Sequence, residues 1–376
     1  MRRCAAFAIS IILILGFIII ETDASAPYED AEAFVVINAA TENVVEGKDI
    51  FKRLPMASTT KIMTAIILCE NIKDLSETIV TTKEMVTVEG SSMGLLEGDT
   101  VSYHDLLYGL LLASGNDAAN TIAISVGGNI ENFVLKMNEK AAELGLENTH
   151  FDTPSGLDGE THYTCAYDLA RIAAYAIKIP EILKATSTKT AKLCYGNPPY
   201  NRSITNHNKL IGSYEGAIGV KTGFTKKSGR CLVSAVKRGE GTLIVVTLNA
   251  ANDYENHKYL IERNFDKLIE TDLPFPEEEV LVPSADGKPI KVSFPLIKSA
   301  LLKEEAENIS YQIYLPKFIY IPVMEGDKIG SIEYFVGEKS LCFADILSAE
   351  SVSSSPMVDK KYIDEFKNTM LRMLRF

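Results

Sequence analysis

Strand-like segments lie at both ends of a long stretch whose middle is helical, and this arrangement limits the folds that the chain can adopt. Short runs rich in β-branched and apolar residues occupy 34–38 and 44–46, and later 218–222, 231–236 and 242–248. Between them the apolar residues are spaced as in helices. Strands from both ends with helices between them predict an α+β fold, in which helices cover an antiparallel sheet.

Six helices are predicted in this stretch from apolar spacing and from signals at their ends. Ser102 with Asp105 three residues later is typical of a helix start, because such a serine caps the free N–H groups of the first turn. Gly145 and Pro180 are typical of positions just beyond a helix end. The predicted helices cover 58–70, 102–113, 117–125, 130–144, 166–177 and about 256–270.

A second, small all-β domain is predicted after Pro274 and Pro276, where the pattern changes. Short strand-like runs separated by Gly, Pro and Asp follow it, at 280–282, 289–293, 310–315 and 328–335. The expected organisation is a leader at 1–26, the α+β domain at 27–272, the all-β domain at 273–348, and a serine-rich linker with a terminal helix at 349–376.

The leader has the layout of a secretory signal peptide. Arg2 and Arg3 precede an apolar run at 5–20, and cleavage after Ala24 or after Ala26 fits the small residues that follow. The run is short for crossing a hydrocarbon core of roughly 30 Å. We therefore expect export with removal of the leader, to the outer face of the cytoplasmic membrane and the cell wall.

The terminal segment is basic and amphipathic. From Met357 onward it carries five basic and three acidic residues, and Ile363, Phe366, Met370 and Leu374 recur at helical spacing. Such a helix after a linker suits the headgroup layer of an anionic membrane. The alternative is a helix that docks on its own domain or in an oligomer interface.

Charge and composition exclude several classes of site. The formal net charge of −12 argues against a nucleic-acid partner, because phosphate binding depends on clustered lysine and arginine. Cys4 leaves with the leader, and the other five cysteines lack CxxC spacing. The five histidines form no HExxH pattern. We expect no metal, no other cofactor and no complete disulfide framework.

Ser58 and Lys61 are the first candidates for catalysis. Three residues apart on a helix, the two side chains share a face, and a buried or charge-repelled lysine can serve as the base that activates a serine. Ser234 and Lys237 have the same spacing, but they fall in a predicted strand, where such positions point to opposite faces. The helix therefore favours the first pair.

Two further motifs strengthen this interpretation. Ser114 and Asn116 flank Gly115 at the end of an apolar helix, where a hydroxyl and a carboxamide can face a cleft; the alternative is an ordinary helix-ending turn. Lys221 and Thr222, with Gly223, lie on a predicted strand where a peptide could approach and its carboxylate could be held. Alone, that segment is also compatible with a solvated strand.

In this order the three motifs resemble the signature of penicillin-binding proteins and class A β-lactamases, S-x-x-K, S-D-N and K-T-G. The chain is most similar to the low-molecular-weight penicillin-binding proteins that are D-alanyl-D-alanine carboxypeptidases, serine peptidases of family S11. The resemblance covers nearly the whole chain and includes residues 151–158, 162–164 and 219–225. Gly115 replaces the aspartate of the signature, which counts against a class A β-lactamase.

The resemblance implies a role for each matched residue. Ser58 would be the acyl-ester nucleophile and Lys61 its proton acceptor, while Ser114 would assist proton transfer. Asn116 would bind the substrate backbone, and Lys221 with Thr222 would receive the terminal carboxylate. Gly223 would be part of the same substrate-binding strand, and the N–H groups of Ser58 and Phe224 would form an oxyanion hole.

The implied reaction removes the terminal D-alanine from peptidoglycan pentapeptide stems, and β-lactam antibiotics would be covalent inhibitors. Three alternatives use the same residues: a D,D-endopeptidase that cuts cross-links, a β-lactamase, and a non-catalytic penicillin-binding wall protein. The all-β domain and the basic terminal segment favour a wall-associated enzyme over a free β-lactamase.

Overall fold

The computed structural model describes residues 30–285 and 287–353 of the 376-residue chain. The predicted signal peptide and the predicted terminal helix lie outside these residues. Within them, no helix combines the length and the apolar character needed to cross a bilayer.

A five-stranded antiparallel sheet forms the centre of the α+β domain, in the order β2-β1-β9-β8-β7. Strands from the two ends of the segment therefore lie side by side, as the sequence predicts. The strands are β1 (Ala33–Asn38), β2 (Val44–Lys48), β7 (Ala217–Thr225), β8 (Gly229–Arg238) and β9 (Gly241–Leu248).

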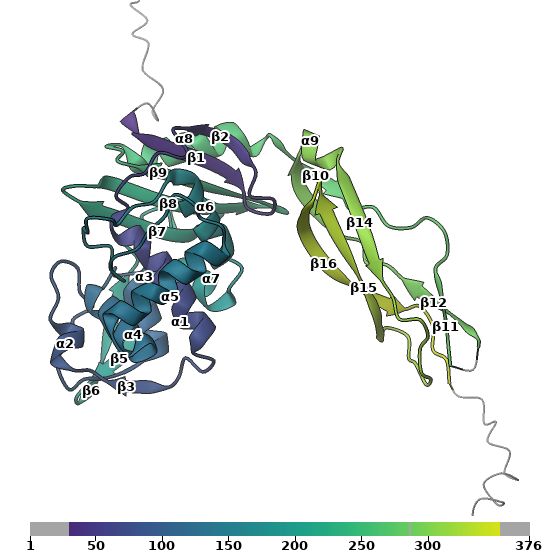
Figure 1. Ribbon diagram of the computed structural model, residues 1–376, viewed down its shortest axis with the longest axis horizontal. Coiled ribbons are helices and arrows are strands. Elements are labelled where there is room, and N and C mark those ends of the chain that lie inside the picture. Colours follow the sequence, from purple (N-terminus) through teal and green to yellow (C-terminus); the bar gives the residue numbers. More distant parts are fainter. Residues whose placement is uncertain (1–29, 286, 354–376) are drawn as a thin grey trace, which may run out of the picture.

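Helices cover both faces of this sheet, which is why every residue of β1 is buried. Val35 and Ile37 face the larger core, beneath most of the helices, whereas Phe34 and Val36 pack with the side chains of α8 on the other face. The α+β fold with helices covering an antiparallel sheet is confirmed (Figure 1). The helices are α1 (Lys61–Asn71), α2 (Lys83–Val86), α3 (Tyr103–Leu111), α4 (Asn116–Gly127), α5 (Ile130–Glu143), α6 (Ala166–Ala176), α7 (Pro180–Thr186) and α8 (Asp253–Phe265).

Three local predictions differ from the structure. Ser58 lies in a 3-10 turn, Ala57–Thr60, that precedes α1. The helix predicted for 256–270 ends at Phe265, and β10 (Leu268–Asp272) follows it, because this segment pairs with β13 (Lys298–Leu302). Neither α7 nor a second, four-stranded sheet was predicted. The strands of this sheet are β3 (Thr78–Val80), β4 (Thr100–Ser102), β5 (Thr190–Gly196) and β6 (Pro199–Thr205).

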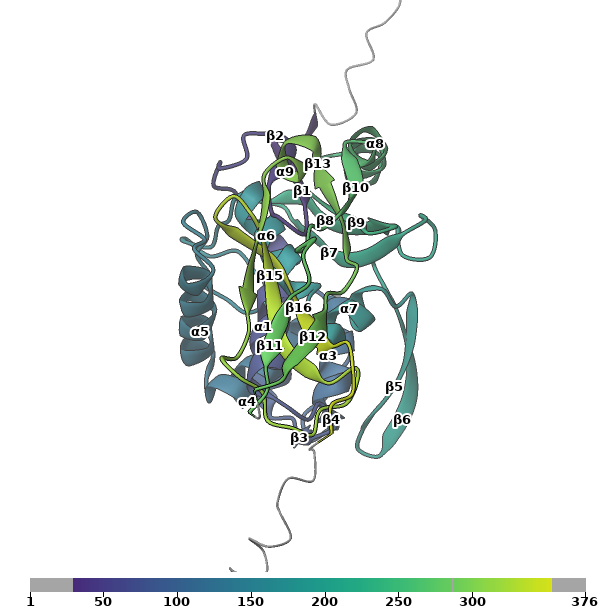
Figure 2. The ribbon, with the colours of Figure 1, turned by 90° about the vertical axis from the view of Figure 1, so that its right-hand side faces the viewer.

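The C-terminal region is a separate all-β domain with its own hydrophobic core, as expected (Figure 1). In Figure 2, which is turned by 90°, its strands face the viewer in front of the α+β domain. The last strand of the all-β domain ends at Ser348, and Val352, within the segment predicted as linker, forms an isolated bridge with Val323. The sheet has the order β11-β12-β16-β15-β14: β11 (Leu281–Pro283), β12 (Pro289–Ser293), β16 (Lys339–Ser348), β15 (Lys328–Val336) and β14 (Ile309–Tyr314).

A buried carboxylate joins the two domains. Glu305, in the short helix α9 (Lys303–Ala306), accepts hydrogen bonds from Thr41 Oγ1 at 2.5 Å, Asn43 Nδ2 at 2.7 Å and Asn38 Nδ2 at 3.2 Å. The backbone N–H of Leu302 donates a further bond of 2.7 Å. One carboxylate therefore satisfies groups from the β1–β2 turn and from its own helix.

Replacing Glu305 by alanine is expected to lower the free energy of unfolding by about 3 kcal/mol, because buried donors lose their acceptor. Urea denaturation followed by circular dichroism measures the change. Glu304→Ala, at the exposed neighbouring position, is the matched control and should stay within about 0.5 kcal/mol of the unaltered protein. Equal values for the two variants would contradict a structural role for this carboxylate.

Candidate active site

Ser58 and Lys61 are in contact where the 3-10 turn runs into α1. Lys61 Nζ lies 2.9 Å from Ser58 Oγ. Ser58 is half-buried and lines a cavity, whereas Lys61 is completely buried. The hydroxyl can thus meet a ligand from the cavity while the amine behind it is shielded from water.

The surroundings of Lys61 Nζ suit a neutral amine. Asn116 Oδ1 at 2.7 Å and the carbonyl oxygen of Ser155 at 2.6 Å can only accept hydrogen bonds. An ammonium donates to these two oxygens and to Ser58 Oγ, whereas a neutral amine can donate to the two and keep its lone pair for the Ser58 hydroxyl. Burial, and then the charge of Lys221, lower the pKa of Lys61 well below its ordinary value, against the opposing effect of Asp117. The amine is therefore equipped to act as a base.

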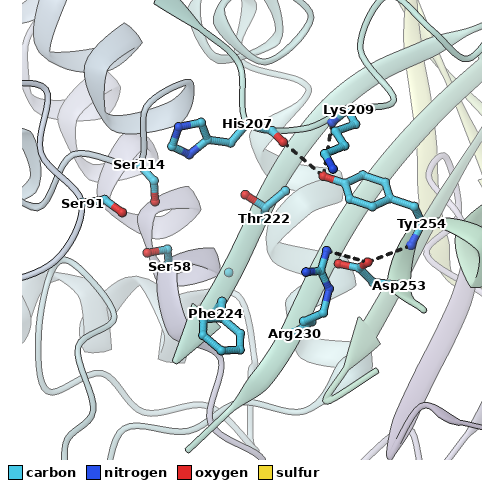
Figure 3. A pocket seen from close by; sticks show the side chains of 11 residues that line it. Ser58, Ser91, Ser114, His207, Lys209, Thr222, Phe224, Arg230, Asp253 and Tyr254 are labelled. Carbon is cyan, nitrogen blue, oxygen red and sulfur yellow. Dashed lines mark hydrogen bonds and ion pairs between the residues drawn. The ribbon is translucent and has the colours of Figure 1, made fainter. Parts of the chain in front are cut away.

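Ser114 lies in the turn between α3 and α4 with a left-handed backbone, at φ 60°. A non-glycine residue in this conformation is strained, and such strain is often found at functional sites. Ser114 is 4% exposed and lines the same cavity as Ser58 (Figure 3). The turn therefore presents a second hydroxyl to the cavity that holds the nucleophile candidate.

Steric crowding explains the glycine at position 115 of this motif. A Cβ at Gly115 would lie 2.6 Å from Asp117 Oδ1 and 3.1 Å from the backbone nitrogen of Met93. Asp117 is fully buried and was not singled out from the sequence, yet its carboxylate holds the loop beside the site. It accepts hydrogen bonds from the backbone N–H groups of Met93, Gly94 and Leu95 and from the Ser92 hydroxyl.

Asn116 lies deeper than a substrate-binding role suggests. It is 4% exposed, its Oδ1 accepts from Lys61, and its Nδ2 donates to the carbonyl oxygen of Glu89 at 2.6 Å. Both ends of the carboxamide are thus engaged within the protein. In this structure Asn116 orients the lysine rather than facing the cavity.

Strand β7 forms the opposite wall and is the edge strand of the main sheet. Thr222, Gly223 and Phe224 line the cavity, and Phe224 is 66% exposed. Lys221 points away from solvent at 1% exposure and donates to the carbonyl oxygen of Thr222 at 3.0 Å. Burial lowers the pKa of Lys221 to about 7. Its charge is therefore only partly retained at neutral pH.

Gly223 lets β7 approach the nucleophile turn. A Cβ there would lie 3.1 Å from the Ser58 nitrogen and 3.0 Å from the carbonyl oxygen of Met56. A larger residue would push the strand away from the turn. The outer edge of β7 is open to an added peptide strand, which is a common mode of peptide recognition.

The turn at 153–158 supports the other side of the Ser58 segment. Besides the Ser155 carbonyl, the backbone of Gly156 packs against Ala57, since a Cβ at Gly156 would lie 1.9 Å from the Ala57 carbonyl oxygen. Asp158 accepts a hydrogen bond of 3.1 Å from Thr225 at the end of β7. The turn thus connects the serine, the lysine and the strand.

The cavity has a volume of about 340 Å³ and is lined by both predicted and unpredicted residues (Figure 3). Those not predicted come from loops, from the start of β8 and from the start of α8, and no motif marks them in the sequence. Lys209 Nζ lies 5.8 Å from the centre of the Tyr254 ring, and Arg230 pairs with Asp253 at 3.0 Å. The unpredicted lining residues are Ser91, His207, Lys209, Arg230, Asp253 and Tyr254.

Among the described residues, no three His, Cys, Asp or Glu side chains are grouped so that they could hold a metal ion.

Comparisons with known proteins show the family of both domains. Residues 20–252 match the family model for D-alanyl-D-alanine carboxypeptidases of peptidase family S11, and residues 276–354 match the C-terminal domain of penicillin-binding protein 5. The D-alanyl-D-alanine carboxypeptidase DacF of Bacillus subtilis (strain 168) is 32% identical over 81% of this chain and 81% of its own length.

Two further relatives are informative. The crystal structure of penicillin-binding protein 5 from Haemophilus influenzae aligns with a TM-score of 0.63 at 25% identity, over 86% of this chain and 98% of that one. A D-alanyl-D-alanine endopeptidase of Pseudomonas aeruginosa is 31% identical over 55% of this chain and 69% of its own length.

Proposed function

This chain belongs to the S11 family of serine-type D-alanyl-D-alanine carboxypeptidases, and from that premise we propose that Ser58 is its nucleophile and Lys61 its general base. The proposed reaction removes the terminal D-alanine from peptidoglycan pentapeptide stems through an acyl-enzyme. The observation that carries the assignment is the 2.9 Å contact between the Ser58 hydroxyl and a completely buried amine, which two further oxygen acceptors hold in place.

In the acylation step Ser58 Oγ bonds to the carbonyl carbon of the penultimate D-alanine, and Lys61 Nζ takes the hydroxyl proton. The N–H groups of Ser58 and Phe224 stabilise the negative charge on the carbonyl oxygen. The C–N bond then breaks, and the amine of the leaving D-alanine receives the proton by way of Ser114. In the second step water attacks the ester carbon and gives its proton to Lys61. The bond between that carbon and Ser58 Oγ then breaks, Lys61 returns the proton to Ser58 Oγ, and the shortened stem leaves, so that the enzyme is regenerated.

The substrate strand would lie along the open edge of β7. Thr222 would donate to the terminal carboxylate, while Lys221 behind it contributes the part of its positive charge that burial leaves. A β-lactam carries an acyl group and a carboxylate in a similar arrangement, and it would acylate Ser58 in the same way. The penicillin-binding fold of the relatives supports both ligands.

The function is tested by incubating the protein with a peptide ending in Lys-D-Ala-D-Ala. We expect release of D-alanine and, in a separate reaction, a fluorescent penicillin bound covalently to the tryptic peptide that contains Ser58. Labelling without release of D-alanine would instead indicate a non-catalytic penicillin-binding protein. Absence of both would remove the assignment.

Export and attachment to the outer face of the cytoplasmic membrane are a further part of the proposal, supported by the pattern of residues 1–26 and by the basic, amphipathic segment from Met357 onward. Vesicles containing anionic lipid should sediment the chain from residue 27 to residue 376, whereas a chain from residue 27 to residue 353 should remain in the supernatant. Equal sedimentation of the two chains would contradict a membrane-binding tail.

A D,D-endopeptidase activity is the second candidate, and a groove next to the cavity favours it. The groove has a volume of about 340 Å³, is lined by Ser92, Met93 and residues 203–207, and shares His207 with the active-site cavity. A leaving group larger than a single D-alanine could extend into it. Cleavage of a cross-linked dimeric muropeptide to monomers would support this activity, and an intact dimer after complete trimming of pentapeptides would exclude it.

A further inference from the structure

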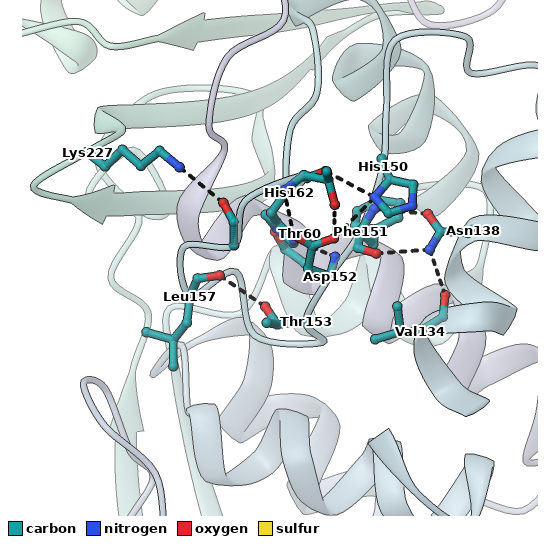
Figure 4. A network of polar contacts seen from close by, with 12 residues as sticks. Thr60, Val134, Asn138, His150, Phe151, Asp152, Thr153, Leu157, His162 and Lys227 are labelled. Carbon is teal, nitrogen blue, oxygen red and sulfur yellow. Dashed lines mark hydrogen bonds and ion pairs between the residues drawn. The ribbon is translucent and has the colours of Figure 1, made fainter. Parts of the chain in front are cut away.

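His162 is buried close to the nucleophile segment, although it touches neither Ser58 nor Lys61 in the hydrogen bonds of the structure. Its Nε2 lies 2.8 Å from Thr60 Oγ1, and its Nδ1 lies 2.9 Å from the backbone nitrogen of Asp152 (Figure 4). The ring is 4% exposed and therefore exchanges hydrogen bonds with the protein rather than with water.

The hydrogen-bond partners determine which nitrogen carries the proton. The Asp152 N–H can only donate, so Nδ1 must accept. Thr60 Oγ1 donates its single hydrogen to the carbonyl oxygen of Ala57 at 2.8 Å, so it accepts from His162 Nε2. Both contacts require the same neutral ring with its proton on Nε2. A second proton would place two donors face to face at Nδ1.

The charged groups around the His162 ring leave it neutral. Burial lowers the pKa of His162 to about 4; the carboxylates of Asp152 and Asp158 oppose this effect, and His150 and Lys227 add to it. The ring is thus neutral near pH 7.

This chain of hydrogen bonds ends on the residue before the nucleophile. Ala57 has a left-handed backbone at φ 48°, which a β-carbon disfavours, and its carbonyl is held by the Thr60 hydroxyl and packed against Gly156. The Ala57 conformation sets the direction of the Ser58 N–H and side chain. A donor bonded to Thr60 Oγ1 strengthens the bond that the same hydroxyl donates.

We propose that His162 is a positioning residue, which holds the Thr60 hydroxyl on the Ala57 carbonyl and thereby keeps Ser58 oriented for acylation. The inference rests on the proposed function of Ser58. It assigns a role to the His162-Tyr163-Thr164 segment that the catalytic assignment leaves unused.

Two substitutions at His162 separate its two hydrogen bonds. In His162→Gln the amide nitrogen can replace Nε2 and still donate to Thr60, whereas in His162→Asn the amide oxygen can replace Nδ1 and still accept from Asp152. We expect the rate of acylation by fluorescent penicillin to fall at least about tenfold in His162→Asn and to stay within about threefold in His162→Gln. Both variants should lose some thermal stability, because each loses one hydrogen bond.

Substitutions at Thr60 test the same link from its other end. Thr60→Val should slow acylation as much as His162→Asn, and Thr60→Ser, which keeps the hydroxyl, should restore the rate. The double variant His162→Asn/Thr60→Val should be no slower than Thr60→Val alone, since both changes remove one chain of hydrogen bonds. His150→Asn, at a partly exposed ring that does not touch Thr60, is the control and should leave the rate unchanged.

Equal rates for the Asn and Gln variants, or effects that multiply in the double variant, would overturn the inference. If Thr60→Val does not fold, the two His162 variants decide. An unaltered protein that penicillin does not acylate would overturn the proposed function itself, whereas an acylated protein with variants of unaltered rate would overturn only the role of His162.

Discussion

Replacing Lys61 by arginine is expected to slow the acylation of Ser58 by about 10²- to 10⁴-fold, the usual contribution of a positioned general base. The unaltered amine is buried, its pKa is lowered, and two acceptors hold its hydrogens. A guanidinium cannot be deprotonated in a protein, so it offers no lone pair to the serine. The measurement is the second-order rate constant for labelling by fluorescent penicillin.

The pH dependence gives this prediction a second readout. Acylation by the unaltered protein should rise with pH as Lys61 loses its proton, below the ordinary lysine range, because the folded pKa is lowered. It should fall again as Lys221, whose pKa burial lowers to about 7, loses the charge that attracts the ligand carboxylate. The arginine variant should lose this rise. Ser58→Ala sets the floor of the assay, since it has no oxygen to acylate. A Lys61→Arg rate within threefold of the unaltered rate would mean that another group is the base.

Local patterns are sufficient to predict the elements whose burial is regular along the chain. β1, β8 and β9 are rich in buried apolar residues, and Ser102 accepts from the Asp105 N–H at the start of α3, as its spacing predicts. β6 escapes prediction because most of its residues are exposed, so that it carries no apolar alternation. β10 was predicted as the end of a helix because what makes it a strand is its pairing with β13, about 30 residues further along the chain, and local sequence does not show this pairing.

In the candidate site, too, contacts between residues close in sequence were predictable and contacts between distant residues were not. The spacing of Ser58 and Lys61 on one turn is local, and the structure brings the two side chains together. The Ser155 carbonyl and the Asn116 carboxamide reach Lys61 from positions 94 and 55 residues away. Neither contact leaves a periodic pattern in the sequence, and a backbone carbonyl has no residue type by which to recognise it. The burial of Asn116 therefore could not be foreseen.

Gly156 is the second position at which a single substitution should have a large effect. Gly156→Ala would place a Cβ 1.9 Å from the Ala57 carbonyl oxygen and 2.4 Å from its carbon. These are backbone atoms of the residue before Ser58, so relief of the clash must move the nucleophile. We expect a loss of roughly 4 kcal/mol or more in the free energy of unfolding, and a loss of about 100-fold or more in acylation rate.

Gly98 separates this clash from backbone strain, because it has the same φ of 85° and no atom within 4 Å of the position that a Cβ would occupy. Gly98→Ala should lower the free energy of unfolding by only about 1–2 kcal/mol, the ordinary penalty of a left-handed alanine, and leave acylation unchanged. The free energy of unfolding, from denaturant titration, and the rate of acylation by penicillin are measured on both variants. Gly98→Ala reports backbone strain alone, and Gly156→Ala reports strain together with the steric clash. If Gly156→Ala behaved like Gly98→Ala, the turn at 153–158 would not determine where Ser58 lies. Strand β7 alone would then have to hold the Ser58 segment in place.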